Sequence, residues 1–470
     1  MFDRRTFLTG VSLVPLIGCV ASGPPLVDAA PTSQFSLDDL ARRTFDWFWD
    51  LADPRTGLVP DRWPTPSFAS IAAVGFALTA YPYGVERGWI GRDQARARTL
   101  TTLRFFATAP QGPAVIGMTG HRGFFYHFLD MKTGARFETT ELSSIDTTLL
   151  LGGVLFAGEY FAGNDPDERE IRRLANDLVE SADWRWMLGE GPFVSMGWKP
   201  ESGFIPHYWD SYNEAMLLNL LALGSDRHGV DPALWTRLTG QFDKSWGMHW
   251  GEEHLHFPPL FGHQYSHIWI DFRGIRDDYM RRRKIDYFEN SARATRAQRN
   301  YAIANPGGWR GYDGEVWGLT ACDGPGDFKA QVAGRNREFF SYSARGPGGR
   351  DDGTIAPTAA ASSIAFAPAL ASAAMAAMHR RYGAAIYGRY GFFDAFNPTL
   401  TSSAGIKLRH GRVVEGLCWV DGDYLGIDQG PIVTMIANHR DDFVWSHMRR
   451  SATLRRGLER AGFSGGWLTQ

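Results

Sequence analysis

The chain has few cysteines and carries little net charge. Its 470 residues include three cysteines, Cys19, Cys322 and Cys418, and the formal net charge at pH 7 is -2, with a pI near 6.7. If Cys19 is lipidated, as suggested below, at most one disulfide can form, and the sequence leaves open whether Cys322 and Cys418 pair. The charge gives no support for binding to nucleic acid or to an acidic membrane surface.

Motifs for nucleotide binding are also missing, and three serines near predicted helix starts lack the motif of a serine hydrolase. No Gly-x-Gly-x-x-Gly follows a predicted strand and there is no phosphate-binding loop, so we expect no cofactor. Ser143, Ser362 and Ser363 lie near predicted helix starts, but none of the three stands in a Gly-x-Ser-x-Gly motif. The sequence therefore disfavours a serine hydrolase built on these residues.

Residues 1–30 are predicted to be a targeting segment. Asp3-Arg4-Arg5-Thr6-Phe7-Leu8 is a twin-arginine pattern, and the apolar residues 11–20 are too few to span a bilayer as a mature helix. Leu16-Ile17-Gly18-Cys19 resembles a lipobox, in which Cys19 would be lipidated. We expect export in the folded state to the periplasm, with Cys19 as a lipid anchor. A soluble exported protein and a retained N-terminal anchor are the alternatives.

A loop pattern recurs along residues 31–470, which we predict to form one domain. At six places a glycine followed by turn residues precedes a predicted helix, and these marker glycines are Gly57, Gly134, Gly203, Gly274, Gly353 and Gly422. Their spacing of 69 to 79 residues suits a helical hairpin with a decorated loop, repeated six times. Gly274 is the weakest marker, because a charged run follows it.

Six such hairpins predict an all-α (α/α)6 toroid, with an inner and an outer helix ring and short β-hairpins on the loops. Beyond a first helix opened by Ser36, helices are expected near residues 69–85, 91–109, 143–163, 166–188, 210–224, 231–246, 280–303, 357–381, 429–439 and 441–461, with hairpins at 124–131 and 193–198. In such a toroid all inner helices start at one end. That geometry would gather Asp61, Asp146, Asp210, Glu214 and Asp428 around a single funnel.

Residues 203–224 contain the most informative pair of acids. The segment changes from loop residues to a leucine-rich apolar run, which predicts a helix whose N-terminus carries Asp210 and Glu214. Residues four apart share one helix face, and the positive end of the helix dipole stabilises carboxylates there.

Aromatic residues make up 14% of the chain, including 17 tryptophans, and many lie outside the apolar runs. They include Trp63, Tyr126, Trp198, Tyr208, Trp209, Tyr212, Trp269 and Trp317. Planar rings beside acids are typical of a sugar site, since rings stack on sugar faces while acids bind hydroxyls. The alternative for each ring is packing between helices.

The segment 254–267 contains four histidines, and two of them, His263 and His267, have a spacing that can hold zinc on a helix. Pro258, Pro259 and Gly262 argue against a continuous helix there, and no glutamate follows His263 as in His-Glu-x-x-His. We therefore predict no metal site.

Stretches across residues 35–460 resemble the bacterial glycoamylase-like proteins, which include the family 144 endo-β-1,2-glucanases and the glucan-processing domain of cyclic β-1,2-glucan synthases. The matching stretches are Ser143-Ser-Ile-Asp-Thr-Thr-Leu-Leu-Leu, Gly203 to Gly224 with its Tyr212-Asn-Glu-Ala-Met, Leu260-Phe-Gly-His-Gln-Tyr-Ser-His-Ile-Trp-Ile-Asp-Phe-Arg-Gly, Trp317-Gly-Leu-Thr-Ala-Cys-Asp-Gly-Pro, Asp352-Gly-Thr-Ile-Ala-Pro, Tyr390-Gly-Phe-Phe-Asp-Ala-Phe-Asn and Tyr424-Leu-Gly-Ile-Asp-Gln-Gly-Pro. The resemblance implies an (α/α)6 toroid that acts on glucan, and inversion at the anomeric carbon.

Glycoside hydrolysis needs a carboxylic acid and a second carboxylate, which stand about 6.5–9.5 Å apart in inverting enzymes. The resemblance assigns the acid to Glu214, in the Tyr-Asn-Glu-Ala segment. Asp146, or failing that Glu141, is the candidate base. The structural alternatives are a helix cap for Asp146 and a buried hydrogen-bonded acid for Glu214.

The remaining candidates are expected to bind the sugar. Trp63, Trp209, Asp210 and Tyr212 come from the aromatic and acid pattern, and the resemblance favours His263, Gln264 and Arg273. Asp323 and Asp428, with Gln429, stand in turn-rich loops and are interpreted as hydroxyl ligands. Turn capping is the alternative role for the two aspartates.

The resemblance, together with these candidate residues, implies an endo-β-1,2-glucanase that releases sophorooligosaccharides by an inverting mechanism. Its partner would be a glucan, and it would contact a membrane only through the lipid anchor. The alternatives within hydrolases are exo action and another glucan linkage. A non-catalytic glucan-binding lipoprotein and a polysaccharide lyase are the alternatives from other classes, although a lyase would favour a basic funnel.

Overall fold

The computed structural model describes residues 34–469. The expected targeting segment, residues 1–30, and the expected lipidation at Cys19 lie outside the described residues. Within 34–469, no helix combines the length and the apolar character needed to cross a bilayer.

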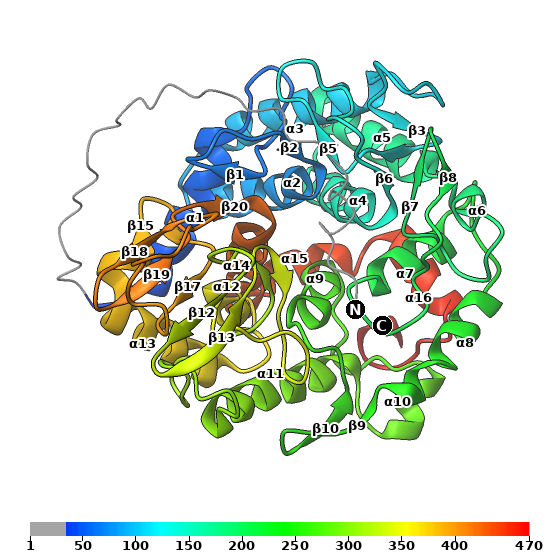
Figure 1. The fold of residues 1–470 in the computed structure, drawn as a ribbon. Coiled ribbons are helices and arrows are strands. Elements are labelled where there is room, and N and C mark those ends of the chain that lie inside the picture. The colour runs from blue at the N-terminus through cyan, green and yellow to red at the C-terminus, as the bar shows by residue number, and fades with distance from the viewer. Residues whose placement is uncertain (1–33, 470) are drawn as a thin grey trace.

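Five helices contact one another in a closed circuit at the centre of the molecule (Figure 1). They are α2 (Ile71–Glu86), α4 (Ser144–Tyr160), α7 (Met216–Gly224), α9 (Phe261–Trp269) and α14 (Gly426–Asp441), and each contacts the next, with α14 contacting α2. The short helix α12 (Pro357–Ala361) packs on α14 from the same inner layer. The protein is therefore helix-rich, with its inner helices arranged in a ring.

A second layer of helices covers this circuit. It comprises α1 (Leu37–Leu51), α3 (Arg92–Thr108), α5 (Pro166–Ser181), α6 (Trp184–Met187), α8 (Ala233–Thr239), α10 (Asp278–Arg283), α11 (Tyr287–Ala304), α13 (Pro368–Ile386), α15 (Phe443–Met448) and α16 (Ala452–Arg460), with 3-10 turns η2 (Phe242–Lys244) and η3 (Gly466–Thr469). Helix α1 contacts α2 and α14, α5 contacts α4, α16 contacts α7, and α11 contacts α9.

Sequence patterning explains which helices lie inside. Residues 71–84 of α2 are all buried, because this helix is apolar on every side. Helix α5 instead buries a stripe that includes Ile171, Leu174 and Leu178 and exposes a charged face. Trp269 of α9 stacks on Phe76 of α2 with ring centroids 5.5 Å apart, so aromatic rings pack between these two inner helices.

Short antiparallel strands connect the loops. The pairs are β1 (Arg62–Trp63) with β20 (Tyr424–Leu425), β2 (Ala69–Ser70) with β5 (Phe128–Leu129), β3 (Gly120–His121) with β4 (Phe124–Phe125), β9 (Trp246–His249) with β10 (Glu252–Leu255), β11 (Ala321–Cys322) with β14 (Ser343–Ala344), β12 (Phe328–Val332) with β13 (Arg335–Phe339) and β15 (Tyr387–Gly388) with β16 (Gly391–Phe392), while β7 (Gly197–Lys199) lies between β6 (Leu142–Ser143) and β8 (Gly203–Phe204), and β19 (Cys418–Val420) lies between β17 (Phe396–Asn397) and β18 (Arg412–Val414). The expected hairpin at 124–131 is wrong, because β4 and β5 pair with different strands.

All six marker glycines have the left-handed backbone conformation, with φ between 72° and 87°. Five of them precede an inner helix, which confirms the repeated loop at those places. Gly274 is the exception, because it follows α9 instead of preceding it. Gly251, with φ +83°, lies in the β9–β10 turn before α9 and takes the expected place.

The predicted helix boundaries fail at three inner positions. Helix α7 begins at Met216, not at residue 210, and the predicted helix at 357–381 is two helices, α12 and α13. Helix α9 was not expected, because Pro258 and Pro259 argued against it. Both prolines precede its first residue, where a missing N–H costs no helical hydrogen bond.

Candidate active site

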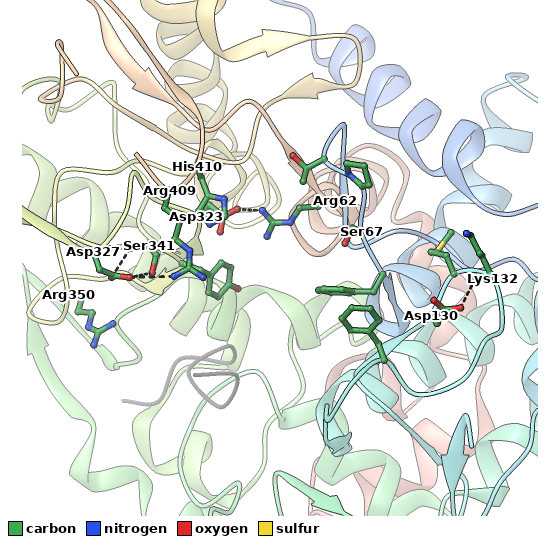
Figure 2. A pocket seen from close by; sticks show the side chains of 16 residues that line it. Arg62, Ser67, Asp130, Lys132, Asp323, Asp327, Ser341, Arg350, Arg409 and His410 are labelled. Carbon is green, nitrogen blue, oxygen red and sulfur yellow. Dashed lines mark hydrogen bonds and ion pairs between the residues drawn. The ribbon is translucent and has the colours of Figure 1, made fainter. Parts of the chain in front are cut away.

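A cavity of about 840 Å³ lies where the loops before the inner helices meet (Figure 2). Its lining residues are Arg62, Thr65, Pro66, Ser67, Phe68, Asp130, Met131, Lys132, Phe137, Asp323, Asp327, Ser341, Tyr342, Arg350, Arg409 and His410. These residues come from the loops that lead into α2, α4, α12 and α14. The helix-start end of the circuit therefore carries the cavity, as the repeat pattern predicted.

Arg62 organises one wall of this cavity. Its Nη1 donates to Asp323 Oδ2 at 2.6 Å, and the same guanidinium lies 3.4 Å from Asp61 and 3.6 Å from Asp423. All four side chains are buried. The backbone N–H of Asp323 donates to Asp394 Oδ2 at 2.7 Å, which joins a further buried acid to the group. Of these residues, the sequence pattern had predicted Asp61 and Asp323.

Burial, followed by the neighbouring charge of Asp323, raises the pKa of Asp394 to about 6. A carboxyl whose pKa is higher in the folded state binds its proton more tightly there, so its stabilising contribution is present below pH 4 and is lost as pH rises through 6.

Asp394→Asn is therefore expected to gain stability relative to the wild type as pH rises from 4 to 7, by about 3 kcal/mol for a shift of this size. The amide mimics the protonated carboxyl and can still accept from the Asp323 N–H. Chemical denaturation of both proteins at pH 4, 5, 6 and 7 measures the difference. A difference that stays constant over this range would contradict the assignment.

A second cluster of acids surrounds His127. Its Nδ1 lies 2.8 Å from Glu141 Oε1, and its Nε2 lies 3.4 Å from Asp146 Oδ2. The His127 ring stacks on Phe128, and Phe128 packs on Phe68 of the cavity lining with ring centroids 4.1 Å apart. The structure thus brings both candidate bases together beside the cavity, through a histidine that the sequence analysis did not single out.

Helix α4 positions Asp146 in its first turn. Ser143 is the N-cap residue, because its Oγ accepts from the Asp146 N–H at 3.1 Å, and the same hydroxyl donates to Asp146 Oδ2 at 2.6 Å. The alternative in which Asp146 caps the helix is therefore wrong. Its carboxylate is turned toward Ser143 and His127, and its side chain is buried.

Glu214 is buried but does not lie on a helix. Helix α7 starts two residues later, and Asp210 is exposed in the preceding loop, so the predicted shared helix face of Asp210 and Glu214 is wrong. The segment is held by its neighbours: Ser266 Oγ of α9 donates to the Glu214 carbonyl at 2.6 Å, and Trp209 Nε1 donates to Ser144 Oγ of α4 at 2.9 Å. Glu214 is thereby fixed to the starts of the inner helices.

Three predicted sugar ligands make hydrogen bonds inside the protein and do not line the cavity. The Tyr212 hydroxyl lies 3.1 Å from His263 Nδ1, whose Nε2 lies 3.1 Å from the Phe257 carbonyl. Gln264 Nε2 donates to the Ala359 carbonyl and to Ser363 Oγ. Burial also holds the pKa of His263 well below its usual value. In this structure these residues join inner helices to one another.

Three of the other predicted ligands, Asp428, Gln429 and Trp63, lie at or near the start of helix α14. Asp428, in the first turn of α14, is buried near Asp394, and Gln429 donates to the Phe392 carbonyl. Trp63 is half-buried against Tyr390 and Tyr424.

Arg273 does not join this site. It pairs with Asp271 and with Asp442, which follows the last residue of α14, whereas Asp428 lies at the start of that helix. A 16-residue helix is about 24 Å long. The expectation that Arg273 lies with the other ligands is therefore wrong.

Comparison with known proteins gives a family. The protein-family model described as "Glycoamylase: Putative glucoamylase" matches residues 206–452, which is just over half of the chain. The crystal structure of a protein from Bacteroides uniformis, described as a "putative glucoamylase", is 30% identical in sequence to this chain and has a TM-score of 0.78. The match covers 93% of this chain and 100% of that one.

Two further relatives have more specific descriptions. The endo-β-1,2-glucanase of Chitinophaga pinensis, solved with sophorotriose and glucose, is 25% identical, with a TM-score of 0.75 and coverage of 92% of this chain and 100% of that one. The exo β-1,2-glucooligosaccharide sophorohydrolase (non-reducing end) of Parabacteroides distasonis is 26% identical over 461 residues, covering 91% of this chain and 58% of that protein. The chain thus spans little more than half of that curated relative's length. On the family match and the Bacteroides uniformis structure, this chain belongs to the glycoamylase family.

Proposed function

We propose that this protein is a glycoside hydrolase that cleaves β-1,2-linked glucan. The observation that carries the proposal is the similarity to the Chitinophaga pinensis endo-β-1,2-glucanase, which extends over the whole of that chain. Buried carboxyl groups beside a loop-lined cavity are the chemistry that such a reaction needs.

Glu214 is the proposed general acid, and Asp146 the proposed base. Glu214 would protonate the leaving oxygen while Asp146 activates a water molecule on the opposite face of the sugar. The hydrogen bond from Ser143 and the contact with His127 hold Asp146 in place, and Glu141 in turn holds His127. This arrangement favours Asp146 over Glu141 as the base, with Glu141 and His127 as positioning residues.

Endo action is the proposed mode, with release of sophorooligosaccharides. The full-length match to an endo enzyme supports it. Exo action is the second candidate, since the curated relative is named as an exo enzyme that acts at the non-reducing end.

We also infer that the two helix layers of residues 34–469 form one complete (α/α)6 toroid, which is the single domain predicted for residues 31–470. The closed circuit of inner helices and the outer helices packed on it support this inference. Export through the twin-arginine pattern, a periplasmic location and lipidation at Cys19 are proposed from residues 1–30 of the sequence.

Asp146→Asn is expected to lower the rate of β-1,2-glucan hydrolysis by about 10²- to 10⁴-fold, the usual contribution of a general base. Glu141→Gln, which leaves Asp146 in place, should have the smaller effect. Initial rates of reducing-end release by the two variants and the wild type measure this. A larger loss of rate in Glu141→Gln than in Asp146→Asn would indicate that Glu141 is the base.

A panel of linear glucans with β-1,2, β-1,3, β-1,4 and β-1,6 linkages tests the substrate class. New reducing ends are expected from the β-1,2 glucan alone. Retained binding of that glucan without any cleavage would instead support the non-catalytic glucan-binding protein.

A further inference from the structure

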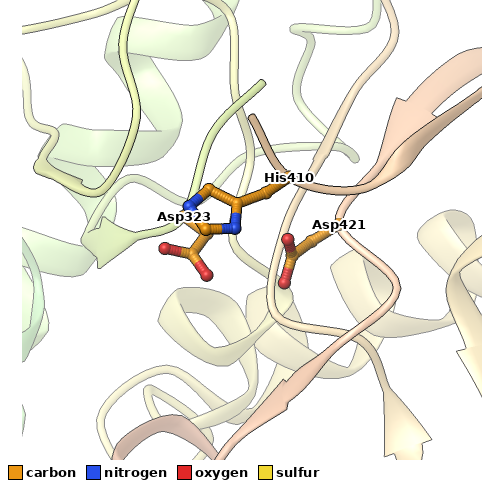
Figure 3. Close-up of side chains that lie close together, drawn as sticks. All are labelled: Asp323, His410 and Asp421. Carbon is orange, nitrogen blue, oxygen red and sulfur yellow. The ribbon is translucent and has the colours of Figure 1, made fainter. Parts of the chain in front are cut away.

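Three ligand-type side chains converge at the edge of the cavity, and none of them is the acid or the base of the proposed reaction. A carboxylate oxygen of Asp323, a ring nitrogen of His410 and a carboxylate oxygen of Asp421 all lie within 4.8 Å of one another (Figure 3). Asp323 and Asp421 are buried, and His410 is half-buried. Asp323 and His410 also line the cavity, so the cluster borders open space.

The backbone around these residues is fixed by several contacts. His410 and Asp421 flank the antiparallel pair β18–β19, and Trp419 Nε1 donates to the His410 carbonyl at 2.9 Å. The N–H of Asp421 donates to the Ala395 carbonyl at 3.0 Å. Gly411, with φ +67°, lets the chain pass the opposite strand, because a Cβ there would lie 2.1 Å from the Val420 carbonyl oxygen. The loop thus holds His410 and Asp421 side by side.

Asp421 is the observation that points to a ligand. The residue is 5% exposed, and neither carboxylate oxygen has a hydrogen-bond partner within residues 34–469. Burying a carboxylate in this way is costly, and buried charges in native proteins are normally paired or bound to a metal. In Figure 3 its carboxylate points toward Asp323 and His410.

The charges around Asp421 are mainly negative. The carboxylates of Asp323, Asp394 and Asp423 lie near enough to repel the Asp421 carboxylate, and the guanidinium of Arg62 attracts it. Arg62 itself makes ion pairs with Asp61, Asp323 and Asp423. A cation beside Asp421 would offset this excess of carboxylates.

We propose that Asp323, His410 and Asp421 bind a divalent transition-metal cation, Mn²⁺ or Zn²⁺, in the wall of the cavity. Two carboxylates and an imidazole suit these ions, whereas Ca²⁺ and Mg²⁺ prefer ligand sets made of oxygen alone. Two ligand atoms that each lie about 2.1 Å from one ion can be at most about 4.2 Å apart. The three ligand atoms here lie within 4.8 Å of one another, so small side-chain movements would complete the site. Three protein ligands leave coordination positions open toward the cavity, where water or a sugar hydroxyl could bind.

Calorimetric titration of the metal-free full chain with MnCl₂, ZnCl₂, CaCl₂ and MgCl₂, without glucan, tests this proposal. Saturable binding of one Mn²⁺ or Zn²⁺ per chain is expected, with weaker binding of Ca²⁺ and Mg²⁺. Because no substrate is present, the result does not depend on the proposed hydrolase activity.

Asp421→Asn and His410→Ala are each expected to weaken metal binding at least about tenfold, since loss of a residue that merely supports a ligand costs 10- to 100-fold. Asp327→Asn is the matched control, because Asp327 lines the same cavity but pairs with Arg409 and Ser341. It should retain wild-type affinity. Circular dichroism of each variant checks that it is folded.

Absence of saturable Mn²⁺ and Zn²⁺ binding by the wild type would overturn the proposal. Unchanged affinity in folded Asp421→Asn and His410→Ala would also overturn it, because the ion would then bind elsewhere.

Discussion

Replacing Glu214 by glutamine is expected to reduce the rate of β-1,2-glucan hydrolysis by about 10²- to 10⁴-fold, because the amide cannot protonate the leaving oxygen. The substitution keeps the side-chain shape, and the Ser266 contact to residue 214 goes to the backbone carbonyl, so the local fold should persist. Reducing-end release from linear β-1,2-glucan gives the rates, and glucan affinity measured separately should change little.

Glu190→Gln is the matched control for this experiment. Glu190 is exposed on the loop after α6, whereas Glu214 is buried, so substitution of Glu190 should leave the rate close to that of the wild type. Full activity of Glu214→Gln would remove Glu214 from the role of general acid and would reopen the assignment of the acid among the buried carboxyls.

Gly153→Ala is expected to lower the free energy of unfolding by about 2 kcal/mol or more. Helices α2 and α4 contact each other backbone to backbone: a Cβ at Gly153 would lie 2.0 Å from the Gly75 carbonyl oxygen, and one at Gly75 would lie 2.1 Å from that of Leu149. Overpacking commonly costs 1–3 kcal/mol. Backbone atoms of a helix cannot move aside as a side chain can, so the cost should fall in the upper part of that range.

Gly158→Ala, on the same helix, is the control for Gly153→Ala. Its added Cβ would meet only the Ala175 side chain, at 3.1 Å, and alanine is the better helix former by about 1 kcal/mol. Chemical denaturation should therefore separate the two variants clearly. Similar stabilities would contradict the close backbone packing of α2 and α4.

The repeated loop could be predicted because its signal is local. Glycine tolerates the left-handed conformation that all six marker positions adopt, and apolar runs mark the inner helices. The prediction that Gly274 precedes an inner helix was wrong, because this glycine has the same backbone conformation but follows helix α9. The start of α7 was misplaced because Asn213 Oδ1 accepts from the Ala215 N–H, a turn that breaks the helical pattern before residue 216.

The site itself could be predicted only in part. Asp146 and Asp428 stand in the first turns of inner helices, a position that the repeat anticipates. The Arg62–Asp323 pair joins residues 261 positions apart, and His127 lies between two acids from later segments of the chain. Such pairings depend on how the loops fold together. No local pattern marks them, so Arg62, His127 and Asp421 emerged only from the structure.

Inverting endo-cleavage of β-1,2-glucan is tested most directly by a time course of the first products. The purified wild-type protein is incubated with linear β-1,2-glucan, and the early products are resolved by size and by anomeric configuration. We expect a mixture of sophorooligosaccharides whose new reducing ends are initially α. The absence of new reducing ends, or reducing ends that first appear in the β configuration, would contradict the account.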